Sequence, residues 1–152
     1  MTAATLNPRL QEIADDFNAV MGQDRLQLLL EFSQELPPLP ARYAEQHDLL
    51  EPVPECQTPL FLAAEVEPDA TVHLFFDAPQ EAPTTRGFAA ILHAGLDGLS
   101  AEEVLATPAE FSGKLGLQDL VSPLRLRGMA AMLSRIKRQV RERAEVRERA
   151  GS

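Results

Sequence analysis

Residues 60–76 have the sequence LFLAAEVEPDATVHLFF, and this stretch decides the fold. On either side of its centre, apolar side chains recur at every second position, which is the period of a β-strand. The central Glu67-Pro68-Asp69-Ala70 has the residue types of a tight turn. We therefore predict an antiparallel hairpin. Because both of its faces are largely apolar, we expect other parts of the chain to cover them.

Helical spacing precedes the hairpin. Asn7 followed by Pro8 is a typical helix start, because an Asn side chain caps free amides and Pro needs no hydrogen bond from its nitrogen in the first turn. We predict one helix from there to Gly22, a second helix capped by Asp24, and a short third helix over residues 41–50.

Helical spacing returns after the hairpin. We predict a helix from near Thr84, short elements over residues 100–106 and 108–117, and a last helix that begins at Ser122-Pro123. Helices, a small antiparallel sheet and further helices, in that order along the chain, are typical of an α+β domain.

The last helix changes character near its end. Its apolar face starts at Leu126 and ends at Val140, and charged residues dominate beyond that point. We therefore predict one domain over residues 1–140, followed by a charged helical tail over residues 141–152 that frays.

Composition limits the class of protein. The chain has 152 residues, 45% of them hydrophobic, which is enough for one globular domain with a core. No stretch approaches the roughly 20 apolar residues that a membrane span needs. The first residues show neither a basic region nor an apolar segment, so we predict no secretory signal. One unpaired cysteine fits a reducing compartment, and we expect the protein in the cytoplasm.

The net charge of −9 is unevenly distributed. Residues 1–124 carry five basic and 20 acidic side chains, a net charge of −15, whereas residues 125–152 carry nine basic and three acidic ones, a net charge of +6. The basic end interleaves both signs, as solvated helices do, and offers no aromatic side chain that could stack on a base. We therefore expect no nucleic-acid partner.

Cys56 is the only cysteine of the chain. Pro54 and Pro59 flank it and predict a short, stiff loop just before the first strand, from which a thiol can be presented to another molecule. A small buried residue without chemical importance fits the same context, because free Cys is among the most buried residue types. The local sequence leaves both interpretations open.

No other residues complete a catalytic or metal site in the sequence. His47, His73 and His93 are dispersed over predicted helices and a strand, and with one cysteine they give no metal-ligand spacing. No Gly-rich phosphate loop is present. A Cys–His thiol enzyme stays an alternative, and it requires that one of these histidines approaches Cys56 in space.

Three motifs follow one another along the chain: Cys56-Gln57-Thr58, EAPTTRGF over residues 81–88, and LGLQDLVSPLRLRGM over residues 115–129. They resemble, in the same order, the Cys-Gln-Ser loop, the acidic-Ala-x-x-x-basic-Gly helix entry and the final Ser-Pro-x-Arg-x-x-Gly segment of the SufE family. This family contains the sulfur acceptors of cysteine desulfurases.

The resemblance implies a SufE/IscU-like fold and a sulfur relay. A desulfurase that contains pyridoxal phosphate holds sulfur as a persulfide, the Cys56 thiolate attacks its outer sulfur, and the new persulfide passes to an iron–sulfur assembly scaffold. The protein would stimulate the desulfurase, have no independent activity, and need no cofactor or metal of its own. We expect the thiol to be sheltered beside Val53, Leu60 or Phe61, because a persulfide is easily reduced or oxidised.

The resemblance also implies a docking surface for the desulfurase. Arg125, Gln57 and either Asp77 or Glu81 occupy the family's positions, and we expect them to share a face with Cys56. Alternatively, Arg125 forms an internal bridge to one of the two acids. A pure adaptor, in which the cysteine is incidental, also stays open.

Overall fold

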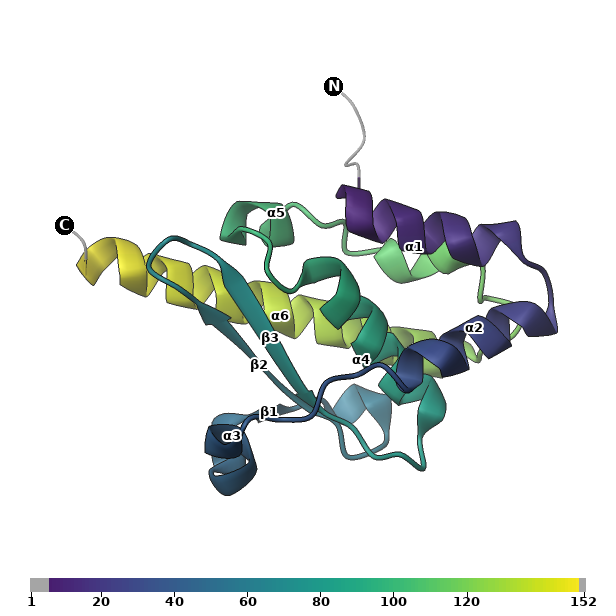
Figure 1. Ribbon diagram of the computed structural model, residues 1–152, viewed down its shortest axis with the longest axis horizontal. Helices are drawn as coiled ribbons and strands as arrows, with labels where there is room; N and C mark the ends of the chain where they lie inside the picture. The colour runs from purple at the N-terminus through teal and green to yellow at the C-terminus, as the bar shows by residue number, and fades with distance from the viewer. Residues whose placement is uncertain (1–5, 151–152) are drawn as a thin grey trace.

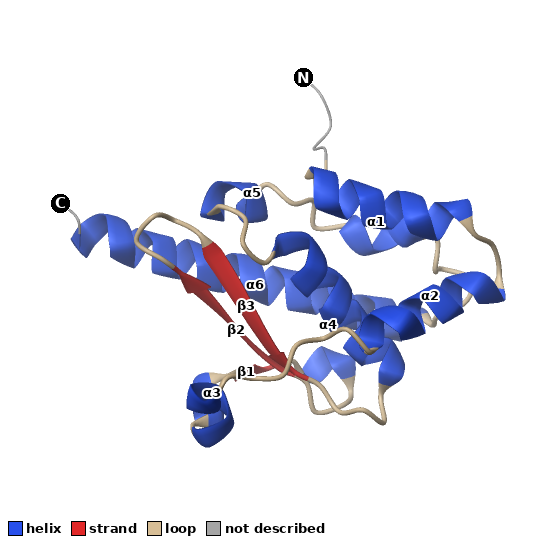
Figure 2. Ribbon diagram, viewed as in Figure 1, coloured by secondary structure: helices blue, strands red, loops and turns tan. Residues whose placement is uncertain are grey.

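Figures 1 and 2 show the protein as a computed structural model, which describes the backbone of residues 6–150 and the side chains of residues 6–146. The fold is α+β, as predicted, with a small antiparallel sheet between α-helices and short 3₁₀ helices (η). The elements of the described range are, in order, α1 (Pro8–Ala19), α2 (Gln23–Ser33), α3 (Ala41–Glu45), η1 (His47–Leu49), β1 (Glu51–Pro52), η2 (Pro54–Cys56), β2 (Phe61–Val66), β3 (Val72–Asp77), α4 (Pro83–Leu96), α5 (Ala101–Leu105), η3 (Phe111–Leu115) and α6 (Pro123–Ala150).

The predicted hairpin is present. β2 and β3 pair antiparallel, with Leu62 opposite Phe76, and Ala70 closes the turn in the left-handed region at φ 71°. β1 is an unpredicted two-residue strand that pairs with β2 and makes the sheet three-stranded. Two residues are too few for a period of two to be visible, and Pro52 is tolerated there because β1 is an edge strand.

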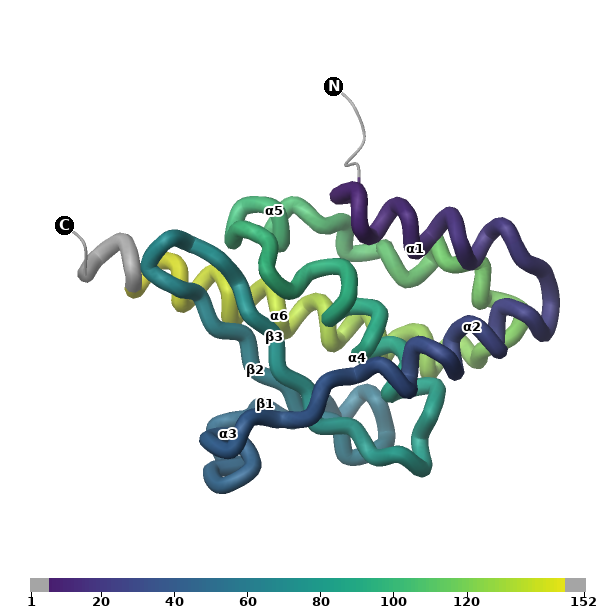
Figure 3. The backbone as a smooth tube through the Cα atoms, in the orientation of Figure 1, coloured from purple at the N-terminus to yellow at the C-terminus, as the bar shows by residue number. Residues whose placement is uncertain are grey.

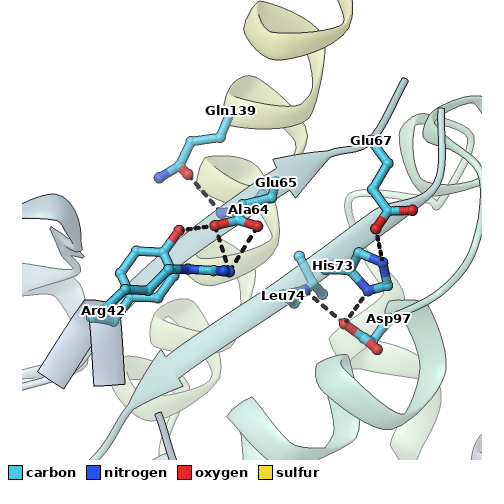
Figure 4. Close-up of polar contacts among 9 residues, drawn as sticks. Arg42, Ala64, Glu65, Glu67, His73, Leu74, Asp97 and Gln139 are labelled. Carbon is cyan, nitrogen blue, oxygen red and sulfur yellow. Dashed lines mark hydrogen bonds and ion pairs between the residues drawn. The ribbon is translucent and has the colours of Figure 1, made fainter. Parts of the chain in front are cut away.

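Both faces of the sheet are covered, as predicted. The inner face packs into the main core, where β2 contacts α6 and β3 contacts α4. The outer face forms a smaller cluster in which the rings of Tyr43 and Phe75 lie 4.9 Å apart. Figure 4 shows how the guanidinium of Arg42, also on α3, reaches the Glu65 carboxylate across this face, at 2.8 Å.

The first helices follow the prediction with two corrections. Asn7 caps α1, as predicted, by accepting a hydrogen bond from the backbone at 3.0 Å. The predicted cap at Asp24 is wrong: α2 already begins after Gly22, whose φ of 57° suits glycine, and Asp24 lies inside the first turn. The predicted helix over residues 41–50 is divided into α3 and η1, because Gln46 leaves the helical region at ψ 69°.

The core lies between α6, α4 and the inner face of the sheet, with α1 and α2 packed on α4. Phe17, Phe88 and Phe111, from three different elements, are fully buried in it. Gly95 lets α1 and α4 approach closely, because a methyl group there would overlap the side chain of Leu10. None of the described helices combines the length and the apolar character that crossing a membrane requires.

α6 is the long helix that crosses behind the sheet in Figures 1 and 3. The Ser122 hydroxyl accepts a hydrogen bond from the Arg125 amide at 3.3 Å, as expected of a cap. The predicted apolar face is buried from Met129 to Val140 and partly buried at Leu126, and the helix continues beyond it to Ala150 without a break. Fraying of the charged tail stays a prediction.

Candidate functional site

The Cys56 loop, residues 53–60, connects β1 to β2. Its ends are joined by a hydrogen bond from the Val53 amide to the Leu60 carbonyl, 2.9 Å long. Pro54 begins the single 3₁₀ turn η2, and Cys56 ends it by donating its amide to the Val53 carbonyl at 3.1 Å. Gln57 then takes the left-handed conformation at φ 59°, which reverses the chain toward β2.

The Cys56 thiol is buried against α6. The residue is 7% exposed, lies in the main core cluster with Val53 and Leu60, and donates from Sγ to the Gly128 carbonyl at 3.6 Å. A Cβ at Gly128 would lie 3.1 Å from Sγ and 3.2 Å from Cα of Cys56, which is closer than ordinary van der Waals contact. The glycine therefore lets the loop approach the helix this closely. The predicted shelter of the thiol is confirmed: Cys56 is buried in the cluster that contains Val53 and Leu60, whereas Phe61 belongs to the cluster on the outer face of the sheet.

Burial makes this thiol a weak acid. Desolvation, and after it the neighbouring Glu55 carboxylate, raise the pKa of the Cys56 thiol to about 11, whereas the Arg135 guanidinium acts in the opposite direction. The thiol is therefore almost entirely protonated at neutral pH while the loop is in this position. Because the thiolate is the nucleophilic form, the closed loop is an unreactive state.

An ion-pair network joins the loop to α6. Arg135 Nη2 lies 3.0 Å from Glu55 Oε1, and Arg135 Nε lies 3.2 Å from Glu51 Oε2. The other oxygen of Glu51 accepts hydrogen bonds from Arg138 and, at 2.8 Å, from Gln139. Burial disfavours the ionised form of Glu51, but these hydrogen bonds outweigh it and its pKa lies below the ordinary value. α6 thus binds two carboxylates, Glu51 and Glu55, which stand at the two ends of the segment just before Cys56.

Gln139 ties the same network to the sheet. Its side chain is buried, and its Oε1 accepts the backbone amide of Ala64 in β2 at 2.8 Å, as Figure 4 shows. Its Nε2 donates to Glu51 in β1. A single amide group therefore satisfies polar groups from two strands and fixes their position relative to α6.

Two of the predicted partner-binding residues lie on the elements that form the thiol site. Gln57 follows Cys56 in the chain and is exposed. Arg125 is exposed and lies about one turn before Gly128 on α6. Within residues 6–146, the Arg125 guanidinium has no salt bridge, so the alternative of an internal bridge to Asp77 or Glu81 is absent from the structure.

The two predicted acids make no polar contact with the thiol loop among the described side chains, although Asp77 lies opposite Phe61, the residue that follows this loop. Asp77 ends β3, where its carboxylate lies 2.7 Å from His47 Nε2. Glu81 is exposed in the turn before α4. Among the side chains that the structure describes, neither acid forms a hydrogen bond or ion pair with the Cys56 loop or with Arg125.

No histidine acts as a base for the thiol within the described residues. His47 pairs with Asp77, while His73 and His93 each lie 3.7 Å from the Asp97 carboxylate. Figure 4 shows His73 between Asp97 and Glu67, on the sheet. The geometry therefore gives no support to a Cys–His enzyme. Over residues 6–146, no three His, Cys, Asp or Glu side chains gather in a way that could hold a metal ion.

Three residues without a predicted role shape the site: Gly128, Glu55 and Arg135. One signal was available: Arg135 follows Gly128 by seven residues, which places both on the same face of a helix. The contact of this face with the loop could not be seen, because it joins segments that are far apart in the chain.

Comparison with known proteins shows the family of this chain. Residues 11–140 match the SufE family, described as an Fe-S metabolism associated domain. An uncharacterized SufE-like protein of Mycobacterium tuberculosis (strain H37Rv) is 58% identical over 143 residues, which cover 93% of this chain and 99% of that protein. The SufE-like protein 1, chloroplastic/mitochondrial, of Arabidopsis thaliana is 30% identical over 129 residues, which cover 84% of this chain and 33% of that protein.

The fold itself has a solved counterpart. The solution structure of a hypothetical protein from Thermus thermophilus superimposes with a TM-score of 0.81 at 40% identity, covering 93% of this chain and 99% of that one. The two chains therefore share one fold. The chain belongs to the SufE family, which places it in Fe–S metabolism and implies partner proteins of sulfur metabolism.

Proposed function

We propose that this protein is a sulfur acceptor and persulfide carrier. Cys56 takes sulfane sulfur from a cysteine desulfurase, the protein thereby stimulates that enzyme, and the sulfur then passes to an iron–sulfur assembly scaffold. The observation that carries the proposal is the position of the only cysteine, buried in a short loop against Gly128. Such a loop shields its sulfur from small reductants and oxidants, and it is short enough to move as a unit.

The transfer step keeps atoms and electrons in balance. The thiolate of Cys56 attacks the outer sulfur of the desulfurase persulfide, a new S–S bond forms, and the old S–S bond breaks. The desulfurase cysteine leaves as a thiolate, and the outer sulfur keeps its proton on Cys56. One S–S bond replaces another, so no oxidant or reductant is consumed.

The exposed residues near the loop support a docking surface. We propose that Gln57, Arg125 and one of the acids Asp77 and Glu81 contact the desulfurase. Arg125 and Glu81 are exposed and, within the described residues, have no ion-pair partner, so a partner protein can engage both charges. We also place this chemistry in the cytoplasm, since a lone thiol suits a reducing compartment. Fractionation that recovers the protein from an oxidising compartment would contradict this location.

Intact mass spectrometry tests the transfer directly. After incubation with a desulfurase and cysteine, we expect the protein to gain the mass of one sulfur atom, which a reductant then removes. Cys56→Ser should keep the fold, since the two side chains are similar in size, and should neither gain sulfur nor stimulate multiple-turnover desulfurase activity. Protein incubated with the desulfurase but without cysteine is the control.

Each alternative function predicts a different outcome of this experiment. Full stimulation of the desulfurase by Cys56→Ser would identify a pure adaptor. A thiol-dependent reaction that proceeds without any desulfurase would identify a thiol enzyme. Either result would refute the carrier function.

A further inference from the structure

One ion pair connects the residue next to the thiol with the helix on which the thiol rests. Arg135 Nη2 and Glu55 Oε1 are 3.0 Å apart, with the Glu55 side chain 47% exposed and that of Arg135 22% exposed. We propose that Arg135 is a positioning residue whose ion pair with Glu55 holds the Cys56 loop closed on α6, and that the loop opens when this pair separates.

The other contacts between the loop and the helix are weaker or less specific. The thiol donates only a long hydrogen bond of 3.6 Å to Gly128, and Sγ is a weak donor. Thr58 reaches Thr85 of α4 at 3.4 Å, which is also long. The contact of Glu55 with Arg135 is the only charge-assisted one among these polar contacts, so its loss is the change that we expect to shift the loop toward the open state.

Arg135 is itself held in place by a second carboxylate. Its Nε pairs with Glu51 in β1, which in turn accepts hydrogen bonds from Arg138 and Gln139. The guanidinium therefore keeps its position when Glu55 leaves. Glu55 is the more exposed member of the pair, so a cationic side chain of a partner can reach it and separate the pair. This use by a desulfurase rests on the proposed function, whereas the control of the loop by Arg135 does not.

Removing the Arg135 charge has two effects of opposite sign on the thiol. In the closed loop the guanidinium lowers the pKa of Cys56, so its loss alone would slow every reaction of the thiolate. If the pair holds the loop closed, the same substitution raises the open population, in which the thiol is exposed and its pKa falls toward the ordinary value. The direction of the change therefore distinguishes a positioning role from a purely electrostatic one.

The test uses the full chain and iodoacetamide, a neutral alkylating reagent, with the rate followed against pH. For Arg135→Gln we expect alkylation about two- to five-fold faster at pH 8, because a partly exposed ion pair stabilises the closed loop by a corresponding amount. We also expect the profile of rate against pH to shift to lower pH. Arg141→Gln is the matched control, because it removes an exposed cation from the same helix that, among the described side chains, pairs with neither Glu51 nor Glu55. Its alkylation rate should equal that of the wild type.

A double-variant cycle attributes the effect to the pair. In a Glu55→Gln background, Arg135→Gln should produce no further acceleration. Slower or unchanged alkylation of Arg135→Gln, or an equal acceleration in the Glu55→Gln background, would overturn the proposal.

If Arg135→Gln fails to fold, amide hydrogen exchange of Glu55→Gln tests whether the pair holds the loop closed. Glu55→Gln should speed exchange of the Cys56 and Gln57 amides, because a single 3₁₀ turn released from α6 lacks support from packing. Unchanged exchange would refute control of the loop by this pair. Because neither measurement involves a desulfurase, a failure of sulfur transfer leaves their outcome unaffected.

Discussion

Replacing Gly128 by alanine tests whether the loop and the helix are separate structural units. The new Cβ would lie 3.1 Å from Cys56 Sγ, 3.2 Å from its Cα and 3.6 Å from the Glu55 carbonyl oxygen. Within the helix, alanine is more favourable than glycine by about 1 kcal/mol. Against the loop, the added methyl group costs about 1–3 kcal/mol of overpacking. Opening of the loop removes the overpacking but keeps the gain in helix stability.

We therefore expect Gly128→Ala to release the loop without unfolding the protein. The melting temperature should stay close to that of the wild type, while the population of the open loop rises about five-fold for each kcal/mol of overpacking. Alkylation of Cys56 at pH 8 should accelerate by the same factor, because the closed thiol is both buried and protonated.

The pH dependence follows from the raised pKa of the thiol. The pKa of Cys56 is about 11 in the closed loop, against an ordinary 9.0. A raised pKa means that the protonated thiol stabilises the closed loop fully below pH 9, and that this contribution is lost as the pH rises from about 9 to about 11. Below pH 9, the protonated thiol contributes about 3 kcal/mol to the free energy that favours the closed loop over the open one. The alkylation rate of the wild type should thus keep rising to about pH 11, whereas that of Gly128→Ala should level off nearer pH 9.

Gly113→Ala is the matched control. Gly113 is exposed in η3, and a Cβ there would meet nothing closer than the Gln118 amide nitrogen at 3.6 Å. Its alkylation profile should coincide with that of the wild type. An unchanged alkylation rate in Gly128→Ala, together with a lowered melting temperature, would show that the loop is an inseparable part of the core and would refute this reasoning.

Two further predictions concern residues around the site. Arg125→Ala should weaken desulfurase binding at least about five-fold in a titration and leave the melting temperature unchanged, because its guanidinium has no salt bridge among the described residues; unaltered binding would remove Arg125 from the docking surface. Gln139→Ala should lower the free energy of unfolding by about 1–3 kcal/mol in denaturant titration, because the buried Ala64 amide loses its acceptor. An unchanged value would mean that another group replaces the amide.

The parts of the fold that sequence analysis predicted are those with a strong local period. The hairpin over residues 60–76 alternates for six residues in each strand, and α6 carries an apolar face over several turns. β1 has no such period, since it is defined only by its pairing with β2. The start of α2 was misplaced because two adjacent signals competed, and the backbone freedom of Gly22 mattered more than the capping side chain of Asp24.

In the site, too, features set by the local sequence could be predicted, and features set by long-range contacts could not. Cys56 could be singled out because it is unique and lies between two prolines. Its pKa could not be predicted, because that value depends on burial against Gly128 and on charges from Glu55 and Arg135. The pairing of Asp77 could not be predicted either, since His47 is 30 residues away in the chain and only the folded structure brings the two together.

The closed loop would make a sulfur carrier of the proposed kind selective for its partners. With a pKa near 11, only about one thiol in ten thousand is ionised at neutral pH, and the side chain is buried as well. A small oxidant or electrophile in solution therefore meets a thiol that can scarcely react. Under the proposed function, a partner that engages Glu55 would open the loop, which would expose the sulfur and lower the pKa of the thiol. Sulfur transfer would then depend on docking at the surface around the loop.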